Sequence, residues 1–440
     1  MIKNQFKSRR LTNVLEDIDS LQRKGRVVEA YGTSIKVSGI NARIGQQCLI
    51  SDKSNSHQIY ADVVGISGDN AILLPLGSIH GIAQNSEVEV IKEKSTIKYS
   101  PELIGRILDG MGRPIDSKQL PLASRDIPIY RDAPSPLTRK PINKPVTTGV
   151  RSIDSTLTLG IGQRTGIFAP AGGGKSTLLS MIARQSVTDV IVIALIGERG
   201  REVREFLEHT LTEEGLSRSV LIISTSDRPA MERLRAAYTA TAIAEGFRSE
   251  GKNVLLLMDS VTRFARALRE IGLSVGEAPV RRGFPSSVFA ELPKLFERSG
   301  NDDKGTMTAF YTVLVEDEET NDPIAEEVRS LLDGHIVLTR KLAQENHYPA
   351  IDILNSTSRL INHITESDHR ASISKLRTLI SKYNEIEFLV QVGEYEEGSD
   401  QIADESISKI EDIKNFLKQD IDDYYPIDDV IHQLKKITDE

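Results

Sequence analysis

The sequence has few cysteines, no long apolar run and no excess of basic residues. Cys48 is the single cysteine among 440 residues, so no disulfide can form within the chain, which fits a reducing compartment. We expect its side chain to pack in a core. No apolar run approaches the ~20 residues of a membrane-spanning helix, and the first residues lack the hydrophobic stretch of a secretory signal. A net charge of −8 argues against a general nucleic-acid binder. These absences predict a cytoplasmic protein.

Residues 1–25 form a basic amphipathic segment. Lysines and arginines surround apolar side chains that recur at helical spacing. These apolar residues are Leu11, Val14, Leu15, Ile18 and Leu21. The pattern predicts a helix that either packs on the next domain or docks on a membrane surface or a partner protein.

Three further regions follow along the chain. Residues 26–97 show short alternating runs broken by Gly, Asn and Ser, which predict a small antiparallel β-barrel. Residues 98–361 alternate apolar strands with helical patterns, as in an α/β domain with a mostly parallel sheet. The predicted strands are 165–169, 190–196, 219–224, 254–258 and 307–315. Residues 362–440 carry only helical periodicity and predict a small acidic helical domain.

A phosphate-binding loop follows the first of these strands. Residues 169–176 are Ala-Pro-Ala-Gly-Gly-Gly-Lys-Ser, and a helical pattern comes next. This matches the P-loop order of strand, G-x-x-x-x-G-K-[ST] and helix, with Ala169 in place of the first glycine. Glycines leave backbone NH groups and the positive end of the helix open to phosphate oxygens. Pro170 has no NH and should mark the edge of this lining. The alternative is an idle surface turn.

The residue types of the loop indicate its chemistry. Lys175 would neutralise charge on the β- and γ-phosphates during catalysis, and the Ser176 hydroxyl would bind Mg²⁺. The predicted phosphate-binding residues are Gly172, Gly173, Gly174, Lys175, Ser176 and Thr177.

Two carboxylates lie at the ends of predicted strands. Asp259 ends the strand in NVLLLMDS, where it can hold Mg²⁺ through water or, alternatively, cap the next helix. Glu198 closes the strand 190–196, where it can orient or deprotonate the water that attacks the γ-phosphate. Without context, Glu198 and Arg199 would be a surface ion pair.

Several stretches together resemble the ATPases of type III protein secretion, which are relatives of the catalytic subunit of the rotary F-type ATP synthase. The resemblance covers about residues 25–435. It implies an ATP-hydrolysing, Mg²⁺-dependent homohexamer whose subunits have a RecA-like P-loop NTPase core between an N-terminal β-barrel and a C-terminal helical domain. The stretches are GERGREVREF, STSDRPAMERLRAAYTATAIAE, MDSVTRFARALRE, GFPSSVFAELPKLFERSG, NDPIAEEVRSLLDGHIVLTRKLA and YPAIDILNSTSR.

The resemblance assigns roles around the phosphates. Glu198 matches the catalytic glutamate, and Arg199 and Arg263 match arginines on the phosphate side. Asp259 matches the magnesium aspartate. Arg359 matches the arginine that is presented to the γ-phosphate of a neighbouring subunit; without the resemblance it would be a surface ion-pair partner. An arginine acting in trans typically contributes ~10³ to 10⁵ in rate. Lone subunits should therefore bind ATP but turn it over slowly.

The resemblance also assigns the adenine site. Tyr348 matches the aromatic that stacks on adenine and Phe416 the second aromatic wall, although Tyr348 alone would suggest a core tyrosine. Gly173 departs from the family, which usually has a bulkier residue there. We expect an unusually mobile loop that orders when nucleotide binds.

The resemblance implies a secretion motor with several partners. Such an ATPase docks complexes of secretion chaperones with their cargo, releases the chaperone and helps to unfold the cargo at the export gate. The C-terminal helices would face the chaperones, and the loop 272–283 would lie near the pore, beside a central stalk protein. The N-terminal helix would contact a stator protein or the cytoplasmic face of the inner membrane, where the ring would be peripheral.

Other functions share parts of this pattern. The flagellar export ATPase shares every catalytic motif, and we favour the injectisome, the virulence-type apparatus, on FYTVLVEDEE and HYPAIDIL. The ATP synthase catalytic subunit is less similar in GERGREVREF. A hexameric RNA translocase needs a basic, aromatic barrel, but Tyr31 and Tyr60 are the only aromatics in residues 26–97. A noncatalytic ring subunit would tend to lack Glu198.

Overall fold

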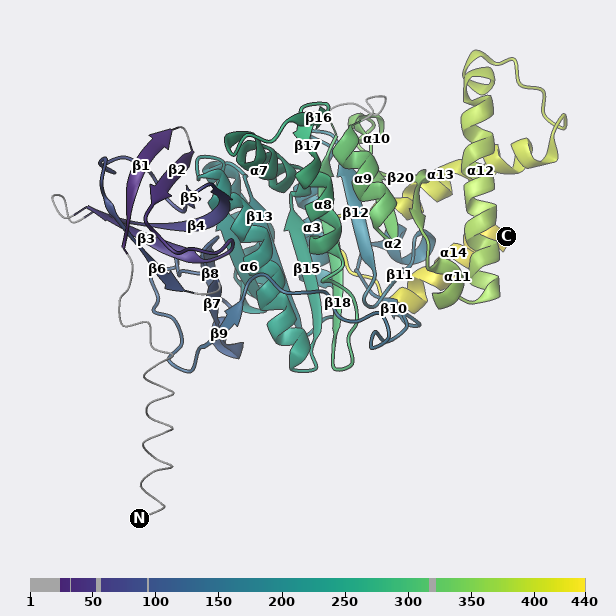
Figure 1. The fold of residues 1–440 in the computed structure, drawn as a ribbon. Helices are drawn as coiled ribbons and strands as arrows, with labels where there is room; N and C mark the ends of the chain where they lie inside the picture. The colour runs from purple at the N-terminus through teal and green to yellow at the C-terminus, as the bar shows by residue number, and fades with distance from the viewer. Residues whose placement is uncertain (1–23, 32, 53–56, 93–94, 316–321, 440) are drawn as a thin grey trace. The chain divides into compact units, whose positions relative to one another are not determined.

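The computed structural model describes residues 24–31, 33–52, 57–92, 95–315 and 322–439 (Figure 1). The chain divides into two compact units, one ending at Ser95 and the other beginning at Thr96. The predicted basic helix lies outside the described residues, apart from the last two positions of its segment.

The first unit is a closed antiparallel barrel with strand order β1-β2-β5-β4-β3-β6. The strands are β1 Gly25–Tyr31, β2 Ser34–Ser38, β3 Gln47–Asp52, β4 His57–Ser67, β5 Asn70–Pro75 and β6 Glu87–Lys92. Alternate side chains such as Val27, Ile35 and Val37 fill the interior together with Cys48. Burial, reinforced by the Asp62 carboxylate, raises the pKa of the Cys48 thiol to about 12. The predicted barrel is confirmed, and its cysteine is a core residue.

The second unit is built on a sheet with strand order β20-β19-β12-β18-β15-β13-β14-β8. All neighbouring pairs are parallel except β19 and β20. The predicted α/β class is therefore confirmed. The strands are β8 Ile107–Asp109, β12 Arg164–Ala169, β13 Val190–Ile196, β14 Ser219–Ser224, β15 Asn253–Asp259, β18 Thr306–Leu314, β19 Gly334–Leu338 and β20 Ile351–Ser358.

A small two-stranded sheet begins the second unit. Strand β7 Thr96–Tyr99 pairs with β9 Arg125–Pro128 rather than with the barrel. The barrel fold therefore ends before β7, whereas the pattern of alternation placed its boundary at residue 97.

Long helices pack on the sheet in the order that the sequence alternation predicts. Nearly every residue of α6 is buried, because this helix lies against β13, β14 and β15 as well as α7. The main helices are α3 Lys175–Gln185, α6 Ala230–Ser249, α7 Val261–Ser274, α8 Ser286–Phe296 and α9 Pro323–Leu331. Short elements join them: η1 Pro101–Leu103, β10 Pro145–Val146, α2 Arg151–Thr156, β11 Leu159–Gly160, α4 Gly200–Glu205, η2 Phe206–Leu211, α5 Thr212–Ser217, β16 Pro279–Arg281, β17 Phe284–Pro285 and α10 Arg340–Gln344.

The C-terminal helices share a hydrophobic core with the sheet. Ile167 of β12, Leu379 of α12 and Ile413 of α13 belong to one continuous buried cluster. Residues 362–439 contain helices and no strands, as predicted for 362–440, but they pack as part of the same compact unit as the sheet. The helices are α11 Ile361–Ile364, α12 Ser367–Val392, α13 Gln401–Leu417 and α14 Ile427–Asp439.

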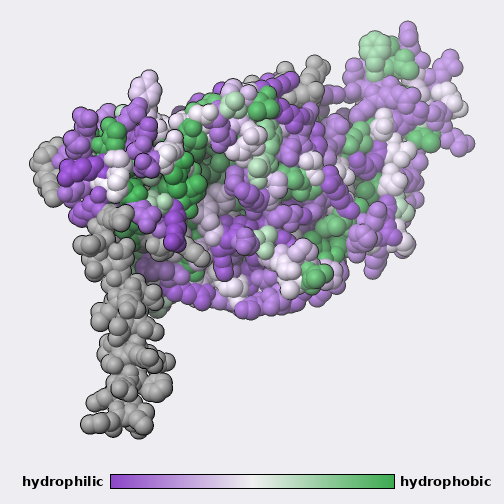
Figure 2. Space-filling model, viewed as in Figure 1, coloured by the Kyte–Doolittle hydropathy of each residue, from purple (hydrophilic) through white to green (hydrophobic). Residues whose placement is uncertain are grey.

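Helix α12 extends beyond this shared core (Figure 1). At its far end Phe388 and Val392 are 69% and 49% exposed, and hydrophobic surface is visible there (Figure 2). No helix among the described residues is both long and apolar enough to cross a membrane.

Candidate active site

The P-loop joins β12 to α3. Gly172 and Gly174 have φ angles of +80° and +81°, a left-handed conformation that favours glycine. Gly173 does not share this conformation, but a Cβ atom there would lie 3.2 Å from Pro170 Cδ. The backbone of the loop thus requires two of the three glycines, and close packing disfavours a side chain at the third.

A cavity of about 770 Å³ lies above the loop. It has the size of a typical small-molecule site. Most residues predicted to bind nucleotide line it: Gly172, Gly174, Lys175, Ser176, Thr177, Glu198, Arg199, Arg263 and Tyr348. Gly173 is buried in the loop and does not line the cavity. Pro170 does line it, in keeping with a position at its edge.

Lys175 lies between the two predicted carboxylates. Its Nζ atom is 2.5 Å from Asp259 Oδ1 and 3.3 Å from Glu198 Oε1. Thr312 Oγ1 donates a hydrogen bond of 2.7 Å to the same Asp259 oxygen. Four adjacent parallel strands, in the order β12, β18, β15 and β13, position these groups where their carboxyl ends meet.

The pKa values of Lys175 and Glu198 are both shifted by burial and by the neighbouring charges. Burial would lower the pKa of Lys175, but the Asp259 and Glu198 carboxylates outweigh burial and raise it. Burial and the Asp259 carboxylate raise the pKa of Glu198 to about 7, against the opposing effect of Lys175. Lys175 therefore remains a cation, and Glu198 can take up or lose a proton near neutral pH.

Two arginines lie on the rim of the cavity. Arg199 is exposed and lies 3.6 Å from Glu202, measured between Nη1 and Oε1. Arg263 is held in the first turn of α7, where its backbone NH donates to the Ser260 side chain. The buried Nε atom of Arg263 has no hydrogen-bond partner among the described residues. It is a donor available to an anion in the cavity.

Tyr348 forms a wall of the cavity beside the P-loop, where a Cβ atom at Gly174 would lie 3.5 Å from Tyr348 Cε1. It is 39% exposed, and its backbone carbonyl accepts a hydrogen bond of 2.9 Å from the Gln419 NH. Phe416 does not form the other wall. It is 4% exposed, lies under the Arg151 guanidinium and lines a different surface hollow. Its place on the inward face of α13 directs it into the shared core.

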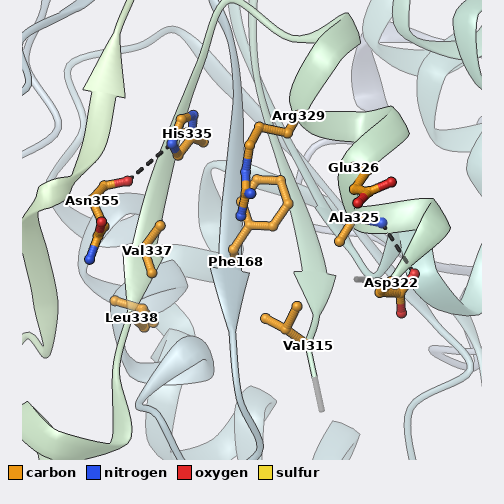
Figure 3. Close-up of a pocket in the computed structure, with 10 residues that line it drawn as sticks. All are labelled: Phe168, Val315, Asp322, Ala325, Glu326, Arg329, His335, Val337, Leu338 and Asn355. Atoms are coloured by element: carbon orange, nitrogen blue, oxygen red, sulfur yellow. Dashed lines mark hydrogen bonds between the residues drawn. The ribbon is translucent and has the colours of Figure 1, made fainter. Parts of the chain in front are cut away.

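Arg359 does not line the cavity of its own chain. It is exposed after the end of β20, where its Nη2 atom donates to the Arg329 carbonyl at 3.1 Å. The side chain of Arg329 lines a separate cavity of about 380 Å³ (Figure 3). There the Arg329 guanidinium lies 4.9 Å from the Phe168 ring centroid, and His335 Nε2 donates to the Asn355 carbonyl at 3.0 Å.

The comparisons with known proteins agree with this geometry. Residues 149–358 match the nucleotide-binding domain of the ATP synthase alpha/beta family, and residues 14–90 match the β-barrel domain of that family. Residues 365–436 match the C-terminal domain of the type III secretion ATPase EscN. The chain is 51% identical to the type 3 secretion system ATPase of Xanthomonas euvesicatoria, over 95% of both sequences. The chain belongs to the type III secretion ATPase family.

Solved structures and flagellar relatives extend this result. The assembled EscN ATPase from the type III secretion system of enteropathogenic E. coli matches with a TM-score of 0.90 and 48% identity, over 94% of this chain and all of that one. The flagellum-specific ATP synthase of Bacillus subtilis is 46% identical over 98% of this chain and 99% of its own. The fold and the ATPase activity expected from the resemblance are confirmed.

Sequence reasoning missed part of the cavity wall in this ATPase. Gln419, Asp420 and Ile421 follow the end of α13 and line the cavity near Tyr348. Ile421 is 46% exposed. It is an apolar residue among the acidic residues of DIDD, and this contrast is the signal in the sequence that could have marked it.

Proposed function

We propose that this type III secretion ATPase binds and hydrolyses ATP in the cavity above the P-loop, as one subunit of a homohexameric ring. The observation that carries the proposal is the position of Lys175 between Glu198 and Asp259 at the base of a nucleotide-sized cavity. A lysine, a base and a metal-binding carboxylate at one sheet edge are the parts that phosphoryl transfer to water requires.

In this proposal the phosphates replace the carboxylates as partners of Lys175. Backbone NH groups of the P-loop and Lys175 bind the β- and γ-phosphates, and Arg263 and Arg199 bind oxygens on the γ side. Ser176 and Asp259 offer the oxygen donors that Mg²⁺ prefers and would hold it; when bound, Mg²⁺ supplies positive charge to the phosphates. Glu198, released from Lys175, then orients the attacking water and accepts its proton.

Arg359 completes the site from a neighbouring subunit in this proposal. It is exposed and lies outside the cavity of its own chain, so it is free to reach the cavity of another copy. An assembled EscN ATPase and a complex of EscN with its central stalk EscO are among the similar structures. These two relatives support a ring of this chain around a central stalk.

We further propose that the ring serves an injectisome at the cytoplasmic face of the inner membrane. It would dock chaperone–cargo complexes through the exposed apolar end of α12. It would then release the chaperone and help to unfold the cargo at the export gate. The ring would also contact a stator protein of the apparatus. The second candidate is the flagellar apparatus, which the flagellar relatives support. Loss of this gene should stop effector secretion and leave swimming intact; the reverse result would assign the chain to the flagellum.

The substitution Glu198→Gln tests the catalytic proposal. We expect ATP hydrolysis to fall by about 10²- to 10⁴-fold, the usual worth of a general base, while ATP binding is kept. Glu205→Gln is the matched control, because Glu205 is an exposed carboxylate on the neighbouring helix α4 and does not line the cavity. If Glu198→Gln hydrolysed ATP at the parent rate, another residue would have to be the general base.

A further inference from the structure

Another cavity, of about 200 Å³, lies between the sheet edge and the C-terminal helices. It is bounded by α10, β20, α12 and α13. Its apolar lining consists of Leu342, Ile351, Ile353, Ile380, Ile410, Ile413 and Leu417. An engineered apolar cavity of ~150 Å³ is enough to bind benzene. This one therefore has room for a compound of one or two rings.

One polar side chain is buried in this lining without a partner. His347 is 6% exposed, and no hydrogen bond joins its ring nitrogens to the residues that the structure describes. Burial, aided by Lys418 and Lys414, lowers the pKa of His347 to about 4. The neutral imidazole thus has one donor and one acceptor to offer. Because a buried polar group without a partner is costly, a ligand with one hydrogen-bonding group would be stabilised there.

The charged groups around the cavity are of both signs, two lysines and three carboxylates. Lys341 Nζ lies 3.7 Å from Glu387 Oε2, and Lys414 Nζ lies 5.2 Å from the centroid of the Tyr383 ring. Glu345 and Asp352 add negative charge to the lining. With cations and carboxylates mixed in this way, the cavity favours a neutral occupant over an anion or a cation.

This cavity shares a wall with the nucleotide cavity. His347 lines one and the adjacent Tyr348 lines the other. On the facing side, Leu417 lines this cavity, and Gln419, two residues later, lines the nucleotide cavity. The Gln419 NH donates to the Tyr348 carbonyl at 2.9 Å and fastens the two sides together. A ligand beside His347 would therefore hold the Tyr348 wall in the position described here.

We propose that this cavity is a regulatory site for a small neutral ring compound with a single hydrogen-bonding group, such as an indole or a phenol. The ligand contacts His347, stabilises the present position of the shared wall, in which Tyr348 lines the nucleotide cavity, and strengthens nucleotide binding. The effect on nucleotide rests on the proposed function of the neighbouring cavity, whereas binding of the ring compound does not.

Indole binding to the full chain tests the site. With isoleucine methyl groups labelled for NMR, we expect indole to shift the signals of Ile380, Ile410 and Ile413. Ile380→Trp should fill the cavity and abolish these shifts. Ile361→Trp is the matched control, because Ile361 is also a partly buried isoleucine on the same core but does not line the cavity. The proposal is overturned if these methyls do not respond, or if they respond equally in Ile380→Trp.

A second variant isolates the hydrogen bond to His347. His347→Phe keeps a ring of similar shape and should weaken indole binding about three- to tenfold, the worth of one net hydrogen bond. Benzothiophene, which has no NH group, should bind both proteins equally. Equal loss for both probes would show that His347 acts only through packing, and would overturn the predicted contact.

Nucleotide titrations test the coupling. In the parent and in Ile361→Trp, saturating indole should strengthen binding of a fluorescent ATP analogue about fivefold or more, and the analogue should strengthen indole binding by the same factor. Ile380→Trp should show neither effect. Unchanged or weaker nucleotide binding would overturn the regulatory role. Failure of the analogue to bind the parent at all would instead refute the proposed nucleotide cavity, while the methyl shifts would still decide the indole site.

Discussion

The two ends of the nucleotide cavity are built in different ways. At the phosphate end, Lys175, Glu198 and Asp259 follow three parallel strands whose ends meet at one sheet edge. At the proposed base end, Tyr348 lies beside the loop after α13, and its carbonyl accepts a hydrogen bond from the Gln419 NH. That loop is fastened to α3 by a hydrogen bond from Gln185 to the Ile421 carbonyl and by the ion pair of Arg184 with Asp422.

We expect the phosphate end to determine the rate of hydrolysis and the base end to determine the affinity for nucleotide. The sheet holds the phosphate end through its backbone ladder, so small sequence changes elsewhere should leave that geometry intact. The base end depends on a few side-chain contacts between distant segments. We expect substitutions at the phosphate end to change turnover and substitutions at the base end to change nucleotide affinity.

The largest effect should come from Arg359→Ala. If Arg359 completes a neighbouring site, the assembled protein loses ~10³-fold or more in turnover. ATP binding is kept, and the rise of specific activity with protein concentration disappears. Arg329→Ala is the control. Arg359 donates a hydrogen bond to the backbone carbonyl of Arg329, and alanine keeps that carbonyl. Activity assays against concentration, together with particle masses, measure this; equal activity of dilute and assembled parent protein would refute the role in trans.

The pH dependence should give the next largest effect. Glu198, with a pKa of about 7, must lose its proton to act as a base. The kcat/KM for ATP hydrolysis should therefore rise about tenfold between pH 6 and pH 8, because the deprotonated fraction rises by that factor. Glu205→Gln should keep this profile, because Glu205 is exposed and does not line the cavity. The same rise in Glu198→Gln would mean that another group titrates.

Substitutions at the base end should change affinity more than turnover. Tyr348→Ala should weaken ATP binding about 5- to 150-fold, the range that base–aromatic stacking of ~1–3 kcal/mol provides. Ile421→Ala should cost less, about fivefold, because a partly buried aliphatic side chain contributes ~1 kcal/mol. Titration with a fluorescent ATP analogue measures both, and Tyr348→Phe should bind like the parent.

Phe416→Leu is the contrasting variant for this end. Because Phe416 is a core residue, the substitution should lower the melting temperature and leave ATP affinity unchanged. A larger loss of affinity in Phe416→Leu than in Ile421→Ala would restore Phe416 as the second wall.

The smallest effect should come from Gly173→Ala. Gly173 lacks the left-handed conformation of its neighbours, so alanine fits if Pro170 shifts by a few tenths of an ångström. Alanine also restricts the free loop by ~0.4–1 kcal/mol. We expect the KM for ATP to change by less than about twofold. Gly174→Ala, at a φ of +81°, should cost more, and equal effects at both positions would contradict the described loop conformation.

The sequence predicted the phosphate end because local pattern carries its geometry. A strand followed by a glycine-rich turn and a helix places Lys175 without knowledge of the rest of the chain. Apolar runs ending in Glu198 and Asp259 then locate the facing carboxylates, since parallel strands end at one edge. The barrel followed from its alternation in the same way.

The base end depends on contacts that no local pattern reports. Phe416 and Ile421 are close in sequence, yet α13 ends between them, so one faces the core and the other the cavity. Phe416 was predicted as the second wall because aromatic side chains stack on bases. Because α13 ends at Leu417, Ile421 lines the cavity and Phe416 does not. The shared core of sheet and C-terminal helices was missed for a similar reason, because helical periodicity shows which face is apolar but not what covers it.

The buried position of Cys48 makes the chain well suited to site-specific labelling. With a pKa of about 12, the thiol is ionised in only about one molecule in 10⁵ at pH 7, so maleimide reagents should leave it untouched in the folded protein. A cysteine introduced on the surface would then be the sole reactive thiol. Dyes attached in this way would report distances between subunits without removal of the native cysteine.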